Sequence, residues 1–287
     1  MLVIIGWLIV TGAVLGGFMY SGGRPMALFV IGEYAIILGV ALGYMVAASP
    51  MHVLKLALSK VLTAFKGSPY SKDMYLDVIK PLYELFMVAR EQGVVGIEEH
   101  VANPHESVIF KKYPKFLADH HAVAFMQDAL RPIIDGRVKG DQLKATLDED
   151  LDRIYAHNAH PVAVMSKIGD ALPGIGIVAA VLGIVITMSS IGGSKEEIGH
   201  HVASALVGTF LGILVSYGYM QPLITNIEFI NDDELNYYQV MSNVIVSYAA
   251  GAPPMMAAES GRRAIPGDRQ PTSEELEALL KSVTPHR

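Results

Sequence analysis

The chain has 287 residues, of which 52% are hydrophobic and only 17% are charged, and its mean hydropathy is +0.37. This composition is too apolar for an ordinary soluble domain of this length, and it predicts a polytopic membrane protein. The formal net charge of −6 argues against nucleic acid as a partner. Because the chain has no cysteine, a disulfide framework, a thiolate nucleophile and a thiolate metal site are excluded.

Four apolar runs predict four transmembrane helices, at about residues 2–20, 27–48, 169–190 and 201–223. Each run offers roughly 20 mostly apolar residues, which matches a hydrocarbon core roughly 30 Å thick. No basic segment precedes the first run, so we interpret it as a retained span rather than a signal peptide. Of the lysines and arginines, 15 lie in residues 49–167 and 5 in residues 226–287, so both termini are predicted to be cytoplasmic.

The spans predict four parts: transmembrane helices 1 and 2 (1–49), a cytoplasmic helical domain (50–167), transmembrane helices 3 and 4 (168–225), and a cytoplasmic extension of helix 4 with the C-terminal tail (226–287). No segment alternates convincingly as a strand, so the predicted fold class is all-α.

Helical periodicity predicts the elements of the cytoplasmic parts. Apolar residues from Tyr75 to Ala89 recur on one helix face, and further helices are predicted at 116–135 and 140–157. The fourth span is expected to continue as one helix from 201 to 250, roughly 75 Å long at ~1.5 Å per residue, which would join the spans to the cytoplasmic domain. A short last helix starts with Thr272 and Glu275, spaced as a capping box.

The sequence contains none of the common enzyme motifs. It has no HExxH, no Walker loop, no GxSxG and no GxGxxG followed by a helix. The histidine pairs at 120–121 and 157/160 have no acidic residue at helical spacing that would complete a hydrolytic metal set. We therefore predict that the chain is not an enzyme and holds no metal and no cofactor.

Two prolines interrupt the last two predicted spans near their cytoplasmic ends. Pro173 removes the amide that would bond the carbonyl of Gly169, and Pro222 frees the carbonyl of Gly218 in the same way. Such carbonyls are costly in lipid unless water or protein reaches them. Two interpretations stay open: tolerated kinks, or a pair of hinges at one membrane level, with Asp170 at the mouth beside them.

Deeper in this hairpin the only polar side chains are hydroxyls, which do not titrate near neutral pH: Thr187, Ser204, Thr209 and Ser216. If ions cross here, a carboxylate must come from another chain. The small residues Ala179 with Gly183, and Gly208 with Gly212, predict faces on which a foreign helix could lie.

Glu33 stands near the periplasmic end of the second predicted span. An intramembrane carboxylate is a functional candidate, since a charge there costs about 2.5–3.5 kcal/mol or more unless it is paired or hydrated. Solvation at the interface is the alternative, because the residue lies close to the predicted membrane surface.

The segments GDALPGIGIVAAVLG (169–183), VGTFLGILVSYGYMQPL (207–223) and NPHES (103–107), in a four-span chain with a helical insert, closely resemble the MotA family, the channel subunits of flagellar motor stators. The resemblance covers essentially the whole chain. It implies a multi-pass protein of the bacterial inner membrane, five copies of which surround two MotB-like single-span subunits. A membrane aspartate of that partner would carry the translocated ion, and the flux would drive the rotor.

The resemblance also assigns roles to residues of the membrane part. Thr209 matches the pore hydroxyl, and Pro173 and Pro222 match two functional prolines. Ala180 stands where sodium-driven relatives tend to have threonine, so the coupling ion is expected to be a proton. Asp170 is a weaker candidate for the same pathway.

In the cytoplasmic part, the family's charged pair falls on Arg90 and Glu98, which would meet complementary charges on the rotor protein FliG. Without the resemblance, these residues are typical of a solvated charged face. Two other functions remain as alternatives: an ExbB- or TolQ-like energiser of an outer-membrane system, whose subunits have three spans, and a structural membrane scaffold.

Overall fold

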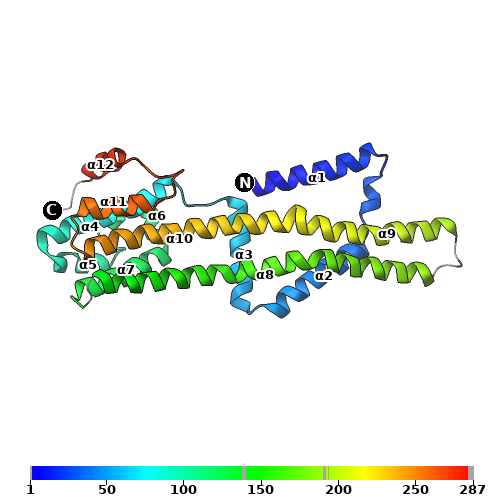
Figure 1. The fold of residues 1–287 in the computed structure, drawn as a ribbon, viewed down its shortest axis with the longest axis horizontal. Helices are drawn as coiled ribbons and strands as arrows, with labels where there is room; N and C mark the ends of the chain where they lie inside the picture. The colour runs from blue at the N-terminus through cyan, green and yellow to red at the C-terminus, as the bar shows by residue number, and fades with distance from the viewer. Residues whose placement is uncertain (1, 138–139, 190–191, 193, 284–287) are drawn as a thin grey trace. The chain divides into compact units, whose positions relative to one another are not determined.

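The computed structural model describes residues 2–137, 140–189, 192 and 194–283 (Figure 1). Within these residues every regular element is helical and no strand occurs, which confirms the all-α class. The α-helices are α1 (Leu2–Tyr20), α2 (Ile31–Ala48), α3 (Met51–Lys66), α4 (Lys72–Gln92), α5 (Glu98–Ala102), α6 (Pro114–Ala118), α7 (His120–Ile134), α8 (Gly140–Ser189), α9 (Lys195–Ile213), α10 (Gln221–Ala249), α11 (Pro254–Ala264) and α12 (Ser273–Lys281). Three 3-10 helices, η1 (Pro25–Leu28), η2 (Val94–Ile97) and η3 (Phe110–Lys112), and one π-helix, η4 (Leu214–Met220), complete them.

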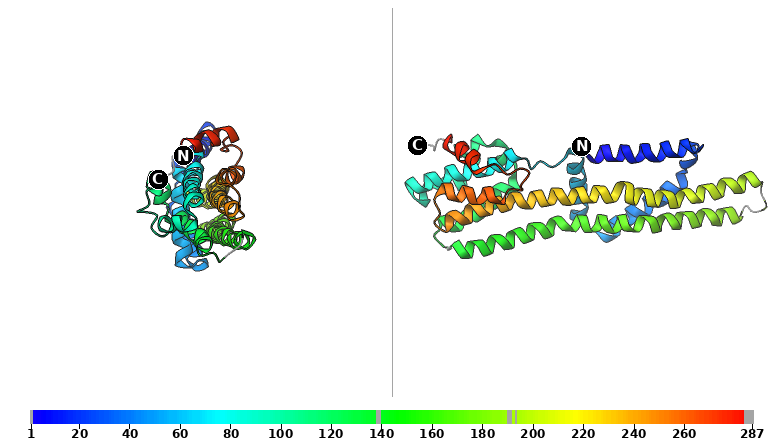
Figure 2. Two further views of the ribbon diagram at one scale, coloured as in Figure 1. Left: turned by 90° about the vertical axis from the view of Figure 1, so that its left-hand side faces the viewer. Right: turned by 45° about the horizontal axis from the view of Figure 1, so that its top comes forward.

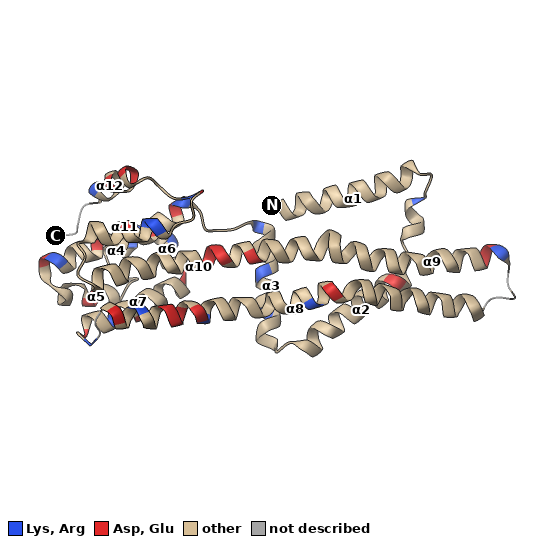
Figure 3. Ribbon diagram, in the orientation of Figure 1, with Lys and Arg blue, Asp and Glu red and all other residues tan. Residues whose placement is uncertain are grey.

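Four helices of the described chain are long and apolar enough to cross a membrane, as predicted. They are α1, α2, α8 and the uninterrupted helical run Lys195–Ala249, which contains α9, η4 and α10. α2 begins at Ile31, later than predicted, because Pro25–Leu28 form a 3-10 helix ahead of it. Charged residues are scarce along α1, α2 and α9 and frequent on the helices of the insert (Figure 3).

The chain forms two compact units. The first contains the residues up to Gly67 together with 158–230, and the second contains 68–157 and the residues from Asn231 onward. The amphipathic helix α3 belongs to the first unit, where its Ala57 and Ala64 are buried in one apolar cluster with Ile227. The functional division into parts 1–49, 50–167, 168–225 and 226–287 stays a prediction.

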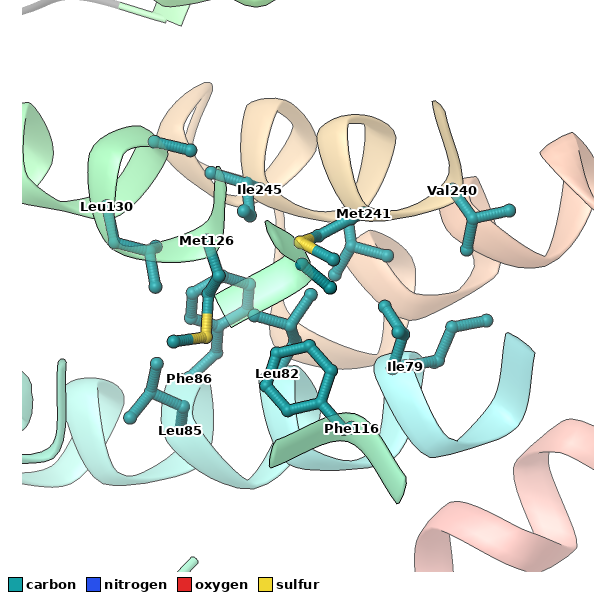
Figure 4. Packing of buried hydrophobic residues seen from close by; sticks show 14 of the residues in the cluster. Ile79, Leu82, Leu85, Phe86, Phe116, Met126, Leu130, Val240, Met241 and Ile245 are labelled. Atoms are coloured by element: carbon teal, nitrogen blue, oxygen red, sulfur yellow. The ribbon is translucent and has the colours of Figure 1, made fainter. Parts of the chain in front are cut away.

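The core of the second unit confirms the amphipathic face predicted between Tyr75 and Ala89 (Figure 4). Side chains of α4 meet side chains of α6, α7 and α10 there, and the labelled members are Ile79, Leu82, Leu85, Phe86, Phe116, Met126, Leu130, Val240, Met241 and Ile245. Pro81 is buried inside α4 and does not end the helix. The packing of this face therefore outweighs the local cost of the proline.

The helix predicted at 116–135 is two helices, α6 and α7, that meet at Asp119. One carboxylate oxygen of Asp119 accepts hydrogen bonds from the backbone amides of His121 and Ala122, at 3.1 Å and 3.0 Å. Aspartate is a strong N-cap because it satisfies amides that have no partner within the helix. The chain therefore restarts a helix at this residue instead of continuing the previous one.

The elements predicted separately at 140–157 and 169–190 are one helix, the 50-residue α8, with Pro161 and Pro173 inside it. Val162 and Met165, which follow the first proline, are buried in one cluster with Leu223. Tertiary packing directly after Pro161 thus holds the helix together across a residue that usually marks a boundary.

The last helix, α12, has the predicted capping box. The Thr272 hydroxyl accepts from the Glu275 amide at 3.1 Å, and the Glu275 carboxylate accepts from the Thr272 amide at 3.1 Å. Leu276 and Leu280 are buried in the core of the second unit, so this helix is docked.

Candidate ion pathway and coupling site

In the first unit, α8 and α9 lie side by side (Figures 1 and 2) and touch through their backbones. A Cβ atom on Gly212 would lie 2.6 Å from the carbonyl oxygen of Leu172 and 2.8 Å from the Cα of Gly176. A Cβ on Gly176 would lie 2.7 Å from the carbonyl oxygen of Gly208. Since these neighbours are backbone atoms, any side chain at either glycine would force the helices apart.

The small faces predicted to receive a foreign helix are therefore used within the chain. Ala179 is fully buried, and a Cβ on Gly183 would lie 2.9 Å from the Cβ of Ala205 on α9. The prediction that these faces await another chain is wrong for them, because a close backbone approach of α8 and α9 already occupies them.

The carbonyl of Gly169, whose helical donor is missing because of Pro173, accepts a hydrogen bond from another element. The Ser216 hydroxyl of η4 donates to the carbonyl oxygen of Gly169 at 2.7 Å, and Ser216 is fully buried. A buried backbone acceptor is nearly always paired, and here the partner comes from the neighbouring helix. The sequence shows Ser216 as a polar residue of the hairpin but gives no sign that it pairs with the freed carbonyl.

Asp170 and the residue before Pro222 also meet. The side-chain amide of Gln221 donates to Asp170 Oδ1 at 2.8 Å, and a Cβ on Gly169 would lie only 3.2 Å from the same amide nitrogen. Asp170 itself is exposed. The contacts at Gly169 and Asp170 bring the regions of both proline breaks to one level of the hairpin.

A π-helix precedes the second proline. Over Leu214–Met220 the turns are wider than in an α-helix, and the Gln221 amide bonds the carbonyl of Ser216, five residues back. Pro222 then stands in the first turn of α10, beside a hollow of about 460 Å³ that Tyr217 and Phe229 also line. π-Helical turns are rare in proteins, and those that occur often lie at functional sites, so η4 is a candidate part of the site. The hydrophobic periodicity of the sequence does not reveal it.

Trp7 ties α1 to this π-helix. Its indole nitrogen donates to the carbonyl of Tyr219 at 3.2 Å, and its ring packs edge-on against Tyr219 and against Phe65 of α3. The Thr11 hydroxyl lies 2.8 Å from the Tyr219 hydroxyl. The first helix is thereby fixed to the interrupted segment of the fourth span by polar and aromatic contacts together.

Glu33 and the predicted pore position Ala180 both lie close to Gly208. Ala180 is 9% exposed, and its backbone nitrogen would lie 3.1 Å from a Cβ on Gly208, the residue before Thr209. Thr209 is half-buried. Glu33 is only 5% exposed, and its Oε2 occupies the place that a Cβ on Gly208 would take. Of the two interpretations of Glu33, the structure supports the buried carboxyl and not solvation at the surface.

Arg90 and Glu98 lie in the second unit, on either side of a chain reversal. Arg90 is exposed in the last turn of α4, and Glu98 is exposed as the first residue of α5. Gly93, with φ of +77°, ends α4, and the fully buried Ile97 anchors η2 between them. Neither charge has a hydrogen bond or ion pair with another described residue, so both are available to a partner.

No group of three or more His, Asp or Glu side chains in the described residues could hold a metal ion. The site is thus built from helix contacts, two proline breaks and isolated polar groups.

Comparison with known proteins identifies the family. The model of the motility protein A N-terminal region matches residues 4–93, and that of the MotA/TolQ/ExbB proton channel family matches residues 118–239. Motility protein A of Salmonella typhimurium is 35% identical over 99% of this chain and 96% of its own length.

Two solved structures share the fold. The MotAB structure of C. jejuni has a TM-score of 0.76 at 18% identity and covers 93% of this chain and 96% of its own. The flagellar MotAB stator complex of Bacillus subtilis has a TM-score of 0.73 at 19% identity and covers 96% of this chain and 98% of its own. The full-length likeness to Salmonella motility protein A and the two family matches therefore place this chain in the motility protein A family of membrane proton-channel subunits.

Proposed function

We propose that this chain is the channel subunit of a flagellar motor stator and that it conducts protons together with a MotB-like single-span subunit. The observation that carries the proposal is the 35% identity to motility protein A over 99% of the chain. The interrupted helical hairpin supports it, because the breaks, the polar contacts and the predicted pore positions all lie on α8, α9, η4 and the first turn of α10.

The ion path runs beside this hairpin, with Thr209 and Ala180 lining it and Asp170 at its cytoplasmic mouth. A membrane aspartate of the partner carries the ion, since the hairpin itself offers no titratable group at mid-membrane. Ala180 stands where sodium-driven relatives tend to have threonine, which favours a proton as the translocated ion.

Pro173 and Pro222 act as hinges of this path. The hydrogen bonds from Ser216 to Gly169 and from Gln221 to Asp170 connect the two breaks, so a change of charge at the mouth reaches α10 directly. Pro173→Ala is expected to impair torque while the protein still assembles in the membrane. Normal swimming of a complemented mutant would remove the hinge from the mechanism.

Arg90 and Glu98 contact the rotor protein FliG. Exposed charge pairs are individually worth about 0–1 kcal/mol and are screened by salt, so the contact is transient, as a stepping motor requires. Both residues are exposed and lack partners among the described residues, which leaves their charges free for such a contact.

The assembly is a homo-pentamer around two partner chains in the bacterial inner membrane, with both termini and the segments 50–167 and 226–287 in the cytoplasm. The four spans favour a stator over an ExbB- or TolQ-like energiser, whose subunits have three. A passive scaffold would not need the paired proline breaks.

The test is proton flux into liposomes that contain the purified chain with or without its co-purified single-span partner. Flux only with the partner, together with restored swimming of a strain that lacks its own channel subunit, supports the proposal. Flux through this chain alone would refute the borrowed carboxylate, and absence of any single-span partner from the native complex would refute the stator assignment.

A further inference from the structure

We infer that Glu33 is a proton-binding carboxyl of the ion pathway, contributed by this chain in addition to the carboxyl of its partner. The inference rests on the proposed proton-channel function and extends it to a residue of the second span.

The carboxyl of Glu33 fills a notch between two other spans. Glu33 projects from the first turn of α2, and its Oε1 would lie 3.4 Å from a Cβ on Gly183 of α8. Its Oε2 takes the place of a Cβ on Gly208 of α9. Glycine at both positions is what makes room for the carboxyl, since a side chain at Gly208 would displace it.

One oxygen of this buried carboxyl lacks the partner that an anion needs. Glu33 is 5% exposed, and Oε2 has no hydrogen-bond partner among the described residues. Thr187, a buried hydroxyl of α8, donates to the carbonyl of Gly183 at 2.9 Å, so its proton is already in use. Because an unpaired buried carboxylate costs several kcal/mol, a bound proton is the simplest way to neutralise this site.

A proton fits this site better than a metal cation. The carboxyl lies against Gly183 of α8 and Gly208 of α9, and neither residue brings a side-chain oxygen or a titratable group. On its own helix the adjacent titratable side chain is Tyr34. A metal cation would need several oxygens here, whereas a proton needs one.

The anionic form is also accessible, as a relay requires. Glu33 lies in the first turn of α2, where the positive end of the helix dipole favours a negative charge. The carboxyl lies against Gly208, which precedes the predicted pore residue Thr209, and a Cβ on Gly208 would also lie 3.1 Å from the backbone nitrogen of Ala180. A group that can hold or release one proton therefore lies close to two predicted positions of the path.

The experiment uses the native complex with its single-span partner in vesicles and measures two quantities. The first is proton flux under an imposed membrane potential. The second is labelling by dicyclohexylcarbodiimide, which attacks protonated carboxyls in apolar surroundings, with the labelled residue located by peptide mass spectrometry. We expect label on Glu33 that declines as pH rises.

Glu33→Gln keeps the shape of the side chain and removes the titratable carboxyl, so flux should fall about 100-fold, a typical loss for one positioned proton-transfer group. Glu33→Asp should recover part of the flux. Glu196→Gln, the same change at an exposed residue in the first turn of α9, serves as the control and should leave flux unchanged.

Unchanged flux in Glu33→Gln, or absence of label from wild-type Glu33, would overturn the inference while the proposed function stands. Absence of flux through the wild-type complex would instead overturn the proposed function. If Glu33→Gln fails to co-purify with the partner, the flux of the assembled Glu33→Asp complex is measured instead. A partly reduced flux in that variant supports the inference. A wild-type flux in Glu33→Asp, together with no label on wild-type Glu33, would overturn it.

Discussion

Replacing Ser216 by alanine tests how the break at Pro173 is stabilised. The serine hydroxyl donates at 2.7 Å to the carbonyl of Gly169, which has lost its helical donor to the proline. Ser216 is fully buried, so water cannot take its place without a change of packing. The variant Ser216→Ala should therefore leave a buried backbone acceptor unpaired.

Two estimates bound the loss of unfolding free energy in Ser216→Ala. An unpaired buried group costs about 1–3 kcal/mol in soluble proteins. Hydrogen bonds between membrane helices are worth less, about 0.6 kcal/mol on average and at most about 1.7 kcal/mol, because the unfolded chain in the membrane finds other partners. Since Pro173 removes the helical donor to Gly169 and Ser216 replaces it, we expect a loss near the upper membrane value, about 1.5 kcal/mol.

The decisive measurement is a double-mutant cycle with Pro173→Ala. Alanine restores the amide that bonds Gly169 within the helix, so loss of the Ser216 hydroxyl should then cost less than about 0.6 kcal/mol. Unfolding free energies of the four proteins in mixed micelles, followed by ellipticity against denaturing detergent, give the coupling. Ser204→Ala, a half-buried serine of α9, serves as the control. Equal costs of Ser216→Ala in both backgrounds would refute the compensation.

Three further changes test other parts of the molecule. Gly212→Ala should destabilise the hairpin by about 1–3 kcal/mol in the same micelle assay, because the new Cβ would meet backbone atoms. Gly174→Ala is the control and should not destabilise it, because a Cβ there would have no neighbouring atom within 4 Å. Equal effects of the two changes would contradict the close approach of α8 and α9. The bidentate hydrogen bonds from Arg262 lower the pKa of Glu259 to about 2, so the ion pair stabilises the fold above the unfolded pKa of about 4.3, and this stabilisation is lost as pH falls towards 2. Thermal unfolding between about pH 5 and pH 3 should therefore show less acid destabilisation in Glu259→Gln than in the wild type. An unchanged pH dependence would count against the pair. Arg90→Glu should reduce swimming speed and be partly rescued by an opposite charge reversal on the rotor, more so at low salt; failure of every plausible partner would make this face structural only.

Sequence periodicity predicted the apolar elements well, because apolar side chains leave water both in a lipid bilayer and in a protein core. The first helix has the predicted bounds, and the face from Tyr75 to Ala89 is the core of the second unit. Local signals were misleading where tertiary contacts override them. The elements expected separately at 140–157 and 169–190 are one helix, α8, which buried side chains after Pro161 hold continuous. Asp119 caps α7, and the apolar pattern that runs through 116–135 does not show this interruption.

The candidate site was predictable in its parts and not in its contacts. The prolines identified two unpaired carbonyls, but the donor to Gly169 comes from Ser216, 47 residues later in the chain. Glu33 illustrates the same limit: its type and depth were visible, while the glycine notch that buries it is formed by two other helices. Such cross-helix contacts depend on how the spans pack, and no single-chain periodicity encodes that packing.

The junction at Trp7 gives the protein an intrinsic optical probe. The chain has one tryptophan, so its emission comes from a single place where α1, α3 and the π-helix meet. The indole nitrogen is bonded to the carbonyl of Tyr219, and the ring is flanked by Phe65 and Tyr219. Any rearrangement of the fourth span that moves Tyr219 alters both contacts and therefore changes the fluorescence of the unlabelled protein.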